Sequence, residues 1–282
     1  MVYNGFSMKK KIAIQGIIGS YHHMASKSFF NEEVDLVECE FFKQIPEAIK
    51  NGNADYGIMA IENTIAGSLL QNYRLLRQDS LKIIGEVYIP IHHQLLVLNG
   101  QDISEITEVH SHPMAILQCE RFFESHPHIK LMEATDTSLA AKELKENGLK
   151  NRGVIASKLA AKIFDLQTLA VDIHTFENNY TRFFVISKTD KEITDKSDVN
   201  KASLRLVLNH EQGSLAKVLS VFLMHGINLT KIQSVPIMNR PWEYAFHIDV
   251  EIPSVATFNS VMEVLSHQVN SYDVLGMYKA WS

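Results

Sequence analysis

Cysteine, tryptophan and long apolar runs are scarce in this sequence. Only two of its 282 residues are cysteine, Cys39 and Cys119, so it lacks the disulfide framework that holds small secreted domains together. No apolar run approaches the roughly 20 residues that a membrane-spanning helix needs. The first residues also lack the apolar segment and cleavage site of a signal peptide. These absences predict a cytoplasmic chain with reduced thiols and no membrane partner.

Basic residues are also fewer than acidic ones. Lysine and arginine total 27 against 32 acidic residues, a net charge of −5, whereas nucleic-acid binding needs a concentrated basic surface. Histidines occur as neighbours, such as His22-His23 and His92-His93. Neighbouring side chains point in different directions, and no cysteine or carboxylate joins these pairs at a zinc-like spacing. We therefore expect no nucleic-acid partner and no metal.

The sequence does contain enough apolar material for two cores. Hydrophobic residues make up 46% and charged residues 21%, and the length favours two domains. Residues 188–202 are rich in charge and poor in large apolar side chains, so they are predicted to be a linker. The first domain is then residues 9–187 and the second is residues 203–282. The seven residues before Met8 are expected to be an unstructured leader.

The first domain alternates short apolar runs with amphipathic segments. Tyr56 to Ile61 shows no polar alternation, which is typical of a strand buried on both faces of a parallel sheet. Helices are predicted over residues 21–30 and 113–124, and strands over residues 12–14 and 153–156. This order predicts a doubly wound α/β fold.

The second domain has a different pattern. Strands are predicted over residues 203–208, 227–237, 242–250 and 274–281. One helix is predicted between residue 214 and Gly226, which ends it at the C′ position, and another over residues 255–268. Ser214 is expected to cap the first of these helices. The order βαββαβ is the ferredoxin-like split arrangement.

Polar side chains follow two of the predicted strands in the first domain. Gly19 and Ser20 lie between a strand and a helix, where free backbone N–H groups favour an anion. Glu62, Asn63 and Thr64 follow the fully buried strand, at the end where open α/β sheets bind ligands. An ordinary βα turn and a capped turn are the alternatives that involve no ligand.

Two further segments carry candidate residues. Ser111 and Gln118 follow a strand and are suited to hydrogen bonding. The segment Thr181-Arg182-Phe183 precedes an apolar run at the end of the first domain. An arginine there can hold a carboxylate through two parallel hydrogen bonds, and Thr181 would lie close to that ligand. A surface ion pair is the alternative for Arg182.

In this order and spacing the segments resemble the prephenate dehydratase family over residues 12–281. The family motif G-P-x-G-[ST]-[YF]-[ST]-H is similar to residues 16–23, P-I-E-N-[ST]-x-x-G-[ST] to 60–68, S-H-P-Q…Q-C to 111–119, and T-R-F to 181–183. Four positions depart from these motifs, namely Ile17, His22, Ala60 and Met114. The departures concern substrate contacts and leave the T-R-F segment intact.

The resemblance implies a catalytic domain of two α/β lobes, like a type 2 periplasmic binding protein. The chain would cross between the lobes near residues 88–96 and 166–173, with the substrate in the cleft. The implied reaction converts prephenate to phenylpyruvate in phenylalanine biosynthesis, with loss of carbon dioxide and water and without a cofactor. Thr181 and Arg182 are the expected catalytic residues. The expected substrate-binding residues are Gly19, Ser20, Glu62, Asn63, Thr64, Ser111, Gln118 and Phe183.

The second domain resembles an ACT domain, a module that senses amino acids. The resemblance implies inhibition by L-phenylalanine and a homodimer or homotetramer. The expected effector-binding residues are Gly213, Ser214, Leu215, Gln233, Ser234 and Pro236. The family's charged glutamate and arginine are replaced by Gln233 and Val235, so phenylalanine is expected to bind more weakly than with the full motif.

Two other functions remain open on the sequence alone. Arogenate dehydratase would perform the same chemistry on the aminated substrate. A non-catalytic two-lobed sensor is the other, because the same fold serves solute receptors.

Overall fold

The structure is a computed structural model, and the residues it describes are 9–78, 81–189, 198–240 and 242–281. The expected leader and residues 190–197 of the predicted linker lie outside the described residues. Among the described residues, no helix is long and apolar enough to cross a bilayer. Two compact units are present, one formed by Met1–Asn72 and Val87–Phe183 and the other by Tyr73–Glu86 and Phe184–Ser282.

The first unit contains two lobes, and the first lobe is built on the sheet β2-β1-β3-β11-β5, with β4 beside β3. Its elements are β1 (Lys11–Gln15), α1 (Tyr21–Phe30), β2 (Asp35–Cys39), α2 (Gln44–Lys50), β3 (Tyr56–Asn63), β4 (Gly67–Ser68), α3 (Leu70–Gln78), β5 (Lys82–Pro90) and β11 (Tyr180–Ser187). Of these, α3 from Tyr73 onward, β5 up to Glu86 and β11 from Phe184 onward belong to the second unit. Strand β1 pairs in parallel with both β2 and β3. Strands β5 and β11 each run from one unit into the other.

The second lobe of this unit is a sheet in the order β10-β6-β9-β7-β8. Its elements are β6 (Gln94–Val97), η1 (Ile103–Glu105), β7 (Glu108–Ser111), α4 (Pro113–Phe123), β8 (Lys130–Glu133), α5 (Thr137–Glu146), β9 (Arg152–Ala156), α6 (Lys158–Ile163) and β10 (Gln167–Ala170). The chain enters this lobe through residues 91–93 and leaves it through residues 171–179. The predicted two-lobed α/β class is confirmed.

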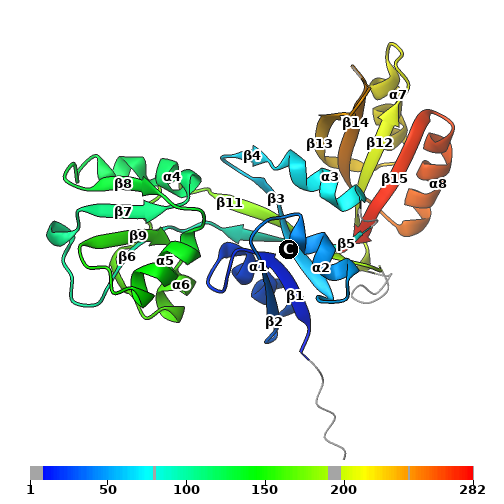
Figure 1. Cartoon of the computed structure of the whole chain (residues 1–282). Coiled ribbons are helices and arrows are strands. Elements are labelled where there is room, and N and C mark those ends of the chain that lie inside the picture. Colours follow the sequence, from blue (N-terminus) through cyan, green and yellow to red (C-terminus); the bar gives the residue numbers. More distant parts are fainter. Residues whose placement is uncertain (1–8, 79–80, 190–197, 241, 282) are drawn as a thin grey trace, which may run out of the picture. The chain divides into compact units, whose positions relative to one another are not determined.

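The second unit carries the βαββαβ order that the sequence predicts (Figure 1). Its elements beyond residue 198 are β12 (Lys201–Leu208), α7 (Ser214–Met224), β13 (Asn228–Pro236), β14 (Tyr244–Glu251), α8 (Val255–Ser266) and β15 (Val269–Tyr278). The strands form an antiparallel sheet in the order β13-β14-β12-β15. The predicted ferredoxin-like fold is confirmed.

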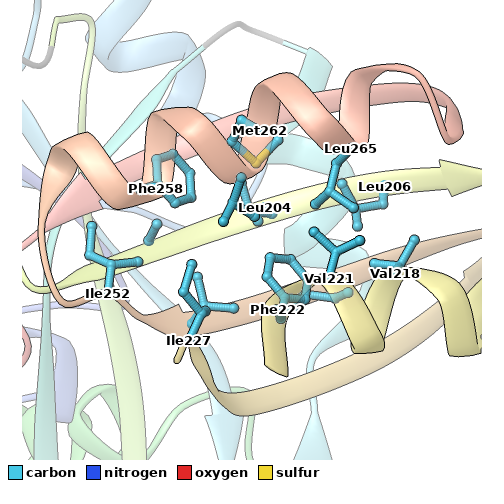
Figure 2. Close-up of a cluster of buried hydrophobic side chains, with 14 residues drawn as sticks. Leu204, Leu206, Val218, Val221, Phe222, Ile227, Ile252, Phe258, Met262 and Leu265 are labelled. Atoms are coloured by element: carbon cyan, nitrogen blue, oxygen red, sulfur yellow. The ribbon is translucent and has the colours of Figure 1, made fainter. Parts of the chain in front are cut away.

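A single apolar cluster holds this sheet to its two helices. Leu204 and Leu206 from β12 meet Phe222 from α7 and Phe258 and Leu265 from α8, and all five side chains are buried. Figure 2 shows these side chains filling the space between the strands and the helices. The side chains of Leu204 and Leu206 therefore both point into the core, as expected for alternate residues of a strand.

One local prediction for this unit is wrong. Gly213, and not Ser214, occupies the N-cap of α7, with φ of 81° in the left-handed region. Ser214 is the first helical residue, and its hydroxyl donates to the carbonyl oxygens of Asn209 and Glu211 at 2.7 and 2.8 Å. Glycine adopts left-handed backbone without a steric cost, so it displaces serine from the cap.

We expect Gly276→Ala to destabilise the second unit by about 1–3 kcal/mol, the range for overpacking a filled interior. A Cβ atom at this buried position would overlap the carbonyl oxygen of Ile83 and lie 2.7 Å from the Ile83 Cβ atom. Urea unfolding of the variant measures this cost. Ser271→Ala, at an exposed position on the same strand, is the control. Equal midpoints for both variants would contradict the prediction.

Candidate functional site

The side chain of Asn63 is bonded directly to Thr181. Its Nδ2 amide donates to Thr181 Oγ1 at 3.0 Å, joining the end of β3 to the start of β11. The orientation of the amide is fixed, because Asn63 Oδ1 accepts the backbone N–H groups of Ile65 and Ala66 at 2.9 and 2.8 Å. Oγ1 of Thr181 thus accepts a hydrogen bond, and its own proton remains available for donation.

Asn179 connects this pair to the second lobe. The Nδ2 group of Asn63 also lies 2.8 Å from Asn179 Oδ1, and Asn179 Nδ2 donates to Gln118 Oε1 at 2.9 Å. Asn179 is 1% exposed and Gln118, from α4, is 5% exposed. The motifs of the sequence predict no role for Asn179. Its place directly before the T-R-F segment was the available signal.

His93 and Tyr21 extend the same network. His93 Nε2 lies 2.9 Å from Gln118 Oε1, and its Nδ1 lies 3.0 Å from the Tyr21 hydroxyl. Burial lowers the pKa of His93 to about 4, so the ring is neutral at pH 7. A neutral ring that donates from Nε2 to the amide oxygen accepts at Nδ1. Sequence reasoning considered this histidine only as a metal ligand.

Arg182 lies away from Thr181. Successive side chains of a strand point to opposite faces, so β11 sends Arg182 to the face opposite Thr181. The guanidinium is buried, lies 3.9 Å from a carboxylate oxygen of Glu62, and stacks over the ring of Tyr88 at 5.9 Å. The structure therefore brings Arg182 and Glu62 together, and their catalytic and substrate-binding roles stay predictions.

The turn at Gly19 and Ser20 is closely packed against the second lobe. Gly19 has φ of +91°, and a Cβ atom there would lie 3.2 Å from the Ala160 Cα atom. The Gly19 carbonyl oxygen accepts the Ser157 hydroxyl at 2.7 Å. The N–H groups of Gly19 and Ser20 already donate, to His23 Nδ1 and to the Ile17 carbonyl oxygen. An anion at this turn therefore needs other donors.

Two predicted substrate-binding hydroxyl groups are engaged within the protein. The Thr64 hydroxyl donates to the Asn178 carbonyl oxygen at 2.9 Å and accepts the Tyr180 N–H at 3.0 Å. Ser111 is fully buried and donates to the Ile155 carbonyl oxygen at 2.7 Å. These three bonds hold loops and strands in place, and contact of either residue with substrate stays a prediction.

Phe183 is fully buried against His22, with ring centroids 4.9 Å apart. The His22 ring also lies 5.6 Å from the Phe42 ring, measured between centroids. Among the described residues, His22 Nε2 is a buried nitrogen with no hydrogen-bond partner. Burial lowers the pKa of His22 to about 3.

We expect the stability of the protein to fall as the pH drops below about 6.5, the ordinary histidine pKa. The folded state keeps His22 neutral down to about pH 3, whereas the unfolded chain protonates near pH 6.5. The unfolded state therefore binds the extra proton in this window, at a cost of about 1.4 kcal/mol per pH unit from this residue. Urea unfolding at pH 7 and pH 5 measures the loss. His22→Phe should reduce it, and an unchanged pH dependence in this variant would contradict the assignment.

A cavity of about 660 Å³ lies elsewhere in the same unit. It is lined by Ile18, His23, Lys27, Glu33, Val34, Asp35, Leu36, Glu38, Leu159, Lys162 and Ile163. None of the predicted site residues lines it. The Thr181 network is therefore separate from this cavity.

The predicted effector residues lie at the start of α7 and along β13, an edge strand of the second unit's sheet. Gln233 donates from Nε2 to the Ser234 carbonyl oxygen at 2.9 Å, and Val235 is buried. Leu215 is half-buried, whereas Gly213, Ser234 and Pro236 are exposed. In the part of the chain that the structure describes, no side-chain hydrogen bond joins the two effector segments. Their joint role stays a prediction.

Comparison with known proteins identifies the family. A family model described as "Prephenate dehydratase" matches residues 12–191. The bifunctional chorismate mutase/prephenate dehydratase of Enterobacter agglomerans is 33% identical over 95% of this chain and 70% of that protein. A solved structure described as "GqqA- a novel type of quorum quenching acylases" has a TM-score of 0.86 and 27% identity, over 96% of this chain and 98% of that one.

The prephenate dehydratase of Arthrobacter aurescens in complex with L-Phe has a TM-score of 0.83 and 23% identity, over 95% of this chain and 90% of that chain. This likeness supports the fold. The family model covers well over half of the chain, including Asn63, Gln118 and Thr181. The chain belongs to the prephenate dehydratase family.

Proposed function

We propose that this protein converts prephenate to phenylpyruvate, carbon dioxide and water in the biosynthesis of L-phenylalanine. Family membership supports the reaction class. The observation that carries the proposal is the bond from the Asn63 amide to Thr181 Oγ1, which leaves the threonine proton free to donate. Among the described residues, Thr181 has no carboxylate or imidazole partner that would make it a nucleophile.

The chemistry of prephenate requires a donor at the leaving oxygen. The bond between the ring carbon and its carboxylate breaks, and that electron pair enters the ring as carbon dioxide departs. The bond from the ring to its hydroxyl then breaks, and the leaving oxygen takes a proton to become water. Aromatisation drives the reaction, while hydroxide is a poor leaving group unless it is protonated or strongly hydrogen-bonded. Thr181 supplies that hydrogen bond.

Asn63 assists this donation electrostatically. Partial negative charge develops on Thr181 Oγ1 as its proton moves toward the leaving oxygen, and the Asn63 N–H group points at that atom. Because Asn179 accepts a hydrogen bond from Asn63 and is itself held by Gln118 of the second lobe, the donor is oriented before the reaction begins. Water restores the proton to the threonine.

The remaining predicted contacts form part of the proposal. Arg182 would bind a substrate carboxylate and the other candidates would orient the ring, within a catalytic domain of residues 9–187 joined by a linker of residues 188–202 to a domain of residues 203–282. Arg182→Lys tests the first role, because an ammonium group cannot reproduce a planar two-point grip. A raised KM supports the contact, and an unchanged KM and kcat leave Arg182 a structural residue beside Glu62 and Tyr88.

One set of assays tests the reaction. The purified chain is incubated with prephenate and phenylpyruvate is measured, and a parallel reaction with arogenate is read by phenylalanine formation. Greater kcat/KM with arogenate would make the protein an arogenate dehydratase. A third reaction uses an acyl-amide substrate and measures its hydrolysis, because a solved structure with this fold is described as an acylase. Binding of prephenate without turnover would indicate a sensor.

We also propose that the second unit's ferredoxin-like fold is an ACT domain that binds L-phenylalanine and inhibits turnover. The βαββαβ order supports the domain type. A solved prephenate dehydratase of the same fold is described as a complex with L-Phe. Phenylalanine is titrated while turnover and heat of binding are followed. Absence of both at millimolar phenylalanine would mean that the domain senses another ligand or has a structural role.

We propose that the protein is a homodimer or homotetramer associated through its ACT domains. Strand β13 is an edge strand, and Ile232 on it is 46% exposed. Trp242 and Tyr244 are exposed nearby in sequence, at 80% and 41%. Unpaired edges and exposed apolar side chains favour association. Light scattering that reports a particle of 32 kDa at micromolar concentration would contradict this proposal.

A cytoplasmic location is the last part of the proposal. Cys39 and Cys119 are free and buried. Free thiols are typical of proteins that work in a reducing compartment. Fractionation of cells that produce the protein tests the location.

A further inference from the structure

Both segments that connect the two lobes carry histidine. His92 lies in the segment between β5 and β6, whereas Asp172 and His174 lie in the segment between β10 and β11. Backbone hydrogen bonds already hold these crossover segments together, from Ile91 N–H to the Asn179 carbonyl oxygen and from Ile173 N–H to the His93 carbonyl oxygen. The fold thus places the His92 imidazole beside the Asp172 carboxylate and the His174 imidazole, which lie about eighty residues later in the chain.

Their ligand atoms are close enough to share an ion. One nitrogen or oxygen atom from each of His92, Asp172 and His174 lies within 4.8 Å of the other two. His92 Nδ1 lies 3.0 Å from Asp172 Oδ1. Ligand atoms about 2.0–2.2 Å from one zinc ion stand about 3 Å apart, so this pair needs little movement. The ring centroids of His92 and His174 lie 5.0 Å apart.

Hydrogen bonds with Gln94 fix the orientation of the Asp172 carboxylate. Gln94, which is 4% exposed, donates from Nε2 to Asp172 Oδ1 at 3.0 Å, and its Oε1 accepts the Asp172 N–H at 3.3 Å. Metal-ligating carboxylates are held by hydrogen bonds of this kind. Nδ1 of His174 has no hydrogen-bond partner within the described ranges, so no bond at that atom fixes the ring. The His92 and Asp172 side chains are 50% and 56% exposed, which gives an ion direct entry.

We propose that His92, Asp172 and His174 form a binding site for a divalent transition metal ion of the Zn²⁺ class, which joins the two crossover segments. Imidazole and carboxylate together suit zinc and its neighbours better than magnesium or calcium, which prefer oxygen ligands. Water fills the remaining position. This site goes beyond the proposed dehydratase reaction, which needs no metal, and it reverses the expectation from sequence spacing.

A bound ion would restrain the two crossover segments that join the lobes. Each lobe ends at the cluster, and the residue after His92 is His93, which contacts Gln118 in the Thr181 network. Because the folded chain places the three ligands together and an unfolded chain does not, the ion binds the folded state preferentially. Zinc should therefore raise the unfolding temperature of the protein.

The test uses the untagged full chain and Zn²⁺ alone, in competition with a chromophoric chelator and without prephenate. We expect one zinc ion per chain and a higher unfolding temperature. His174→Ala and Asp172→Asn should each weaken binding by at least about tenfold, the lower end of the loss seen for residues that only support a ligand. Mg²⁺ should not compete.

His128→Ala is the matched control, because His128 is exposed and its ring centroid lies 6.2 Å from that of another histidine, His126. Within the described residues, these two histidines share no ligand cluster with a carboxylate. Each variant's unfolding temperature in chelator shows whether it still folds. No zinc binding by the parent chain, or equal affinity in the parent, His174→Ala and His128→Ala, overturns the proposal. Since the readout is zinc affinity, these outcomes are independent of dehydratase activity.

Discussion

Replacing Thr181 by alanine is expected to lower kcat about 10²- to 10⁴-fold, the range for loss of a positioned proton donor. The bond from Asn63 leaves the Thr181 proton as the donor to the leaving oxygen, and alanine offers neither the proton nor the acceptor. The fold should survive, because Thr181 is only half-buried near the start of β11. Steady-state turnover of prephenate, with phenylpyruvate as the readout, measures the loss.

Companion variants separate chemistry from structure. Thr181→Ser keeps the hydroxyl and should retain most of the activity. Asn63→Ala removes an N–H group aimed at Oγ1, for which a loss of about 10²- to 10³-fold is expected. Thr168→Ala, at an exposed threonine on β10, is the control and should leave kcat unchanged. Turnover by Thr181→Ala within about threefold of the parent would show that the threonine is not the donor.

Local patterns predicted most elements of the fold because they depend on nearby residues. Helix α1 begins and ends where predicted, since Ser20 accepts the His23 N–H group and Asn31 adopts left-handed backbone at its end. The uninterrupted apolar run after residue 55 became β3, which is buried along nearly its whole length. No local sequence pattern predicts that Tyr73–Glu86 belongs to the second unit. It depends on contacts such as Lys82 Nζ with the Val274 carbonyl oxygen, 192 residues apart.

The candidate site also depends on contacts between residues that are far apart in the sequence, and local patterns do not predict such contacts. The family resemblance assigned Asn63 and Thr181 to one substrate cleft, and the structure joins their side chains although 118 residues separate them. Adjacency in sequence suggested that Arg182 acts beside Thr181, but strand alternation sends the two side chains to opposite faces. Asn179 bears a common side chain whose role arises only from its position between Asn63 and Gln118. The carboxylate beside His92 was equally hidden, because Asp172 is 80 residues away.

Glu86→Ala is expected to have the largest effect on stability, a loss of about 3–5 kcal/mol. Glu86 Oε1 lies 2.7 Å from Lys201 Nζ, and the two side chains are only 1% and 6% exposed. The pair joins β5 to β12 within the second unit. Removing the carboxylate would leave a buried ammonium group without its ion-pair partner, and a buried charge of this kind costs more than the pair contributes.

The double variant Glu86→Leu/Lys201→Met distinguishes this mechanism from a loss of packing. Removing both charges removes the desolvation cost as well, and apolar side chains of similar size often replace a buried pair without loss. We therefore expect the double variant to regain most of the stability that Glu86→Ala loses, as measured by urea unfolding of the parent and both variants. If the double variant is as unstable as the single one, Glu86 stabilises the unit through its packing and its hydrogen bonds, such as that from the Trp281 N–H group at 3.4 Å, and not through its charge. If Glu86→Ala costs less than about 1 kcal/mol, the typical value of an exposed pair, water reaches Lys201 and the pair is not buried in solution.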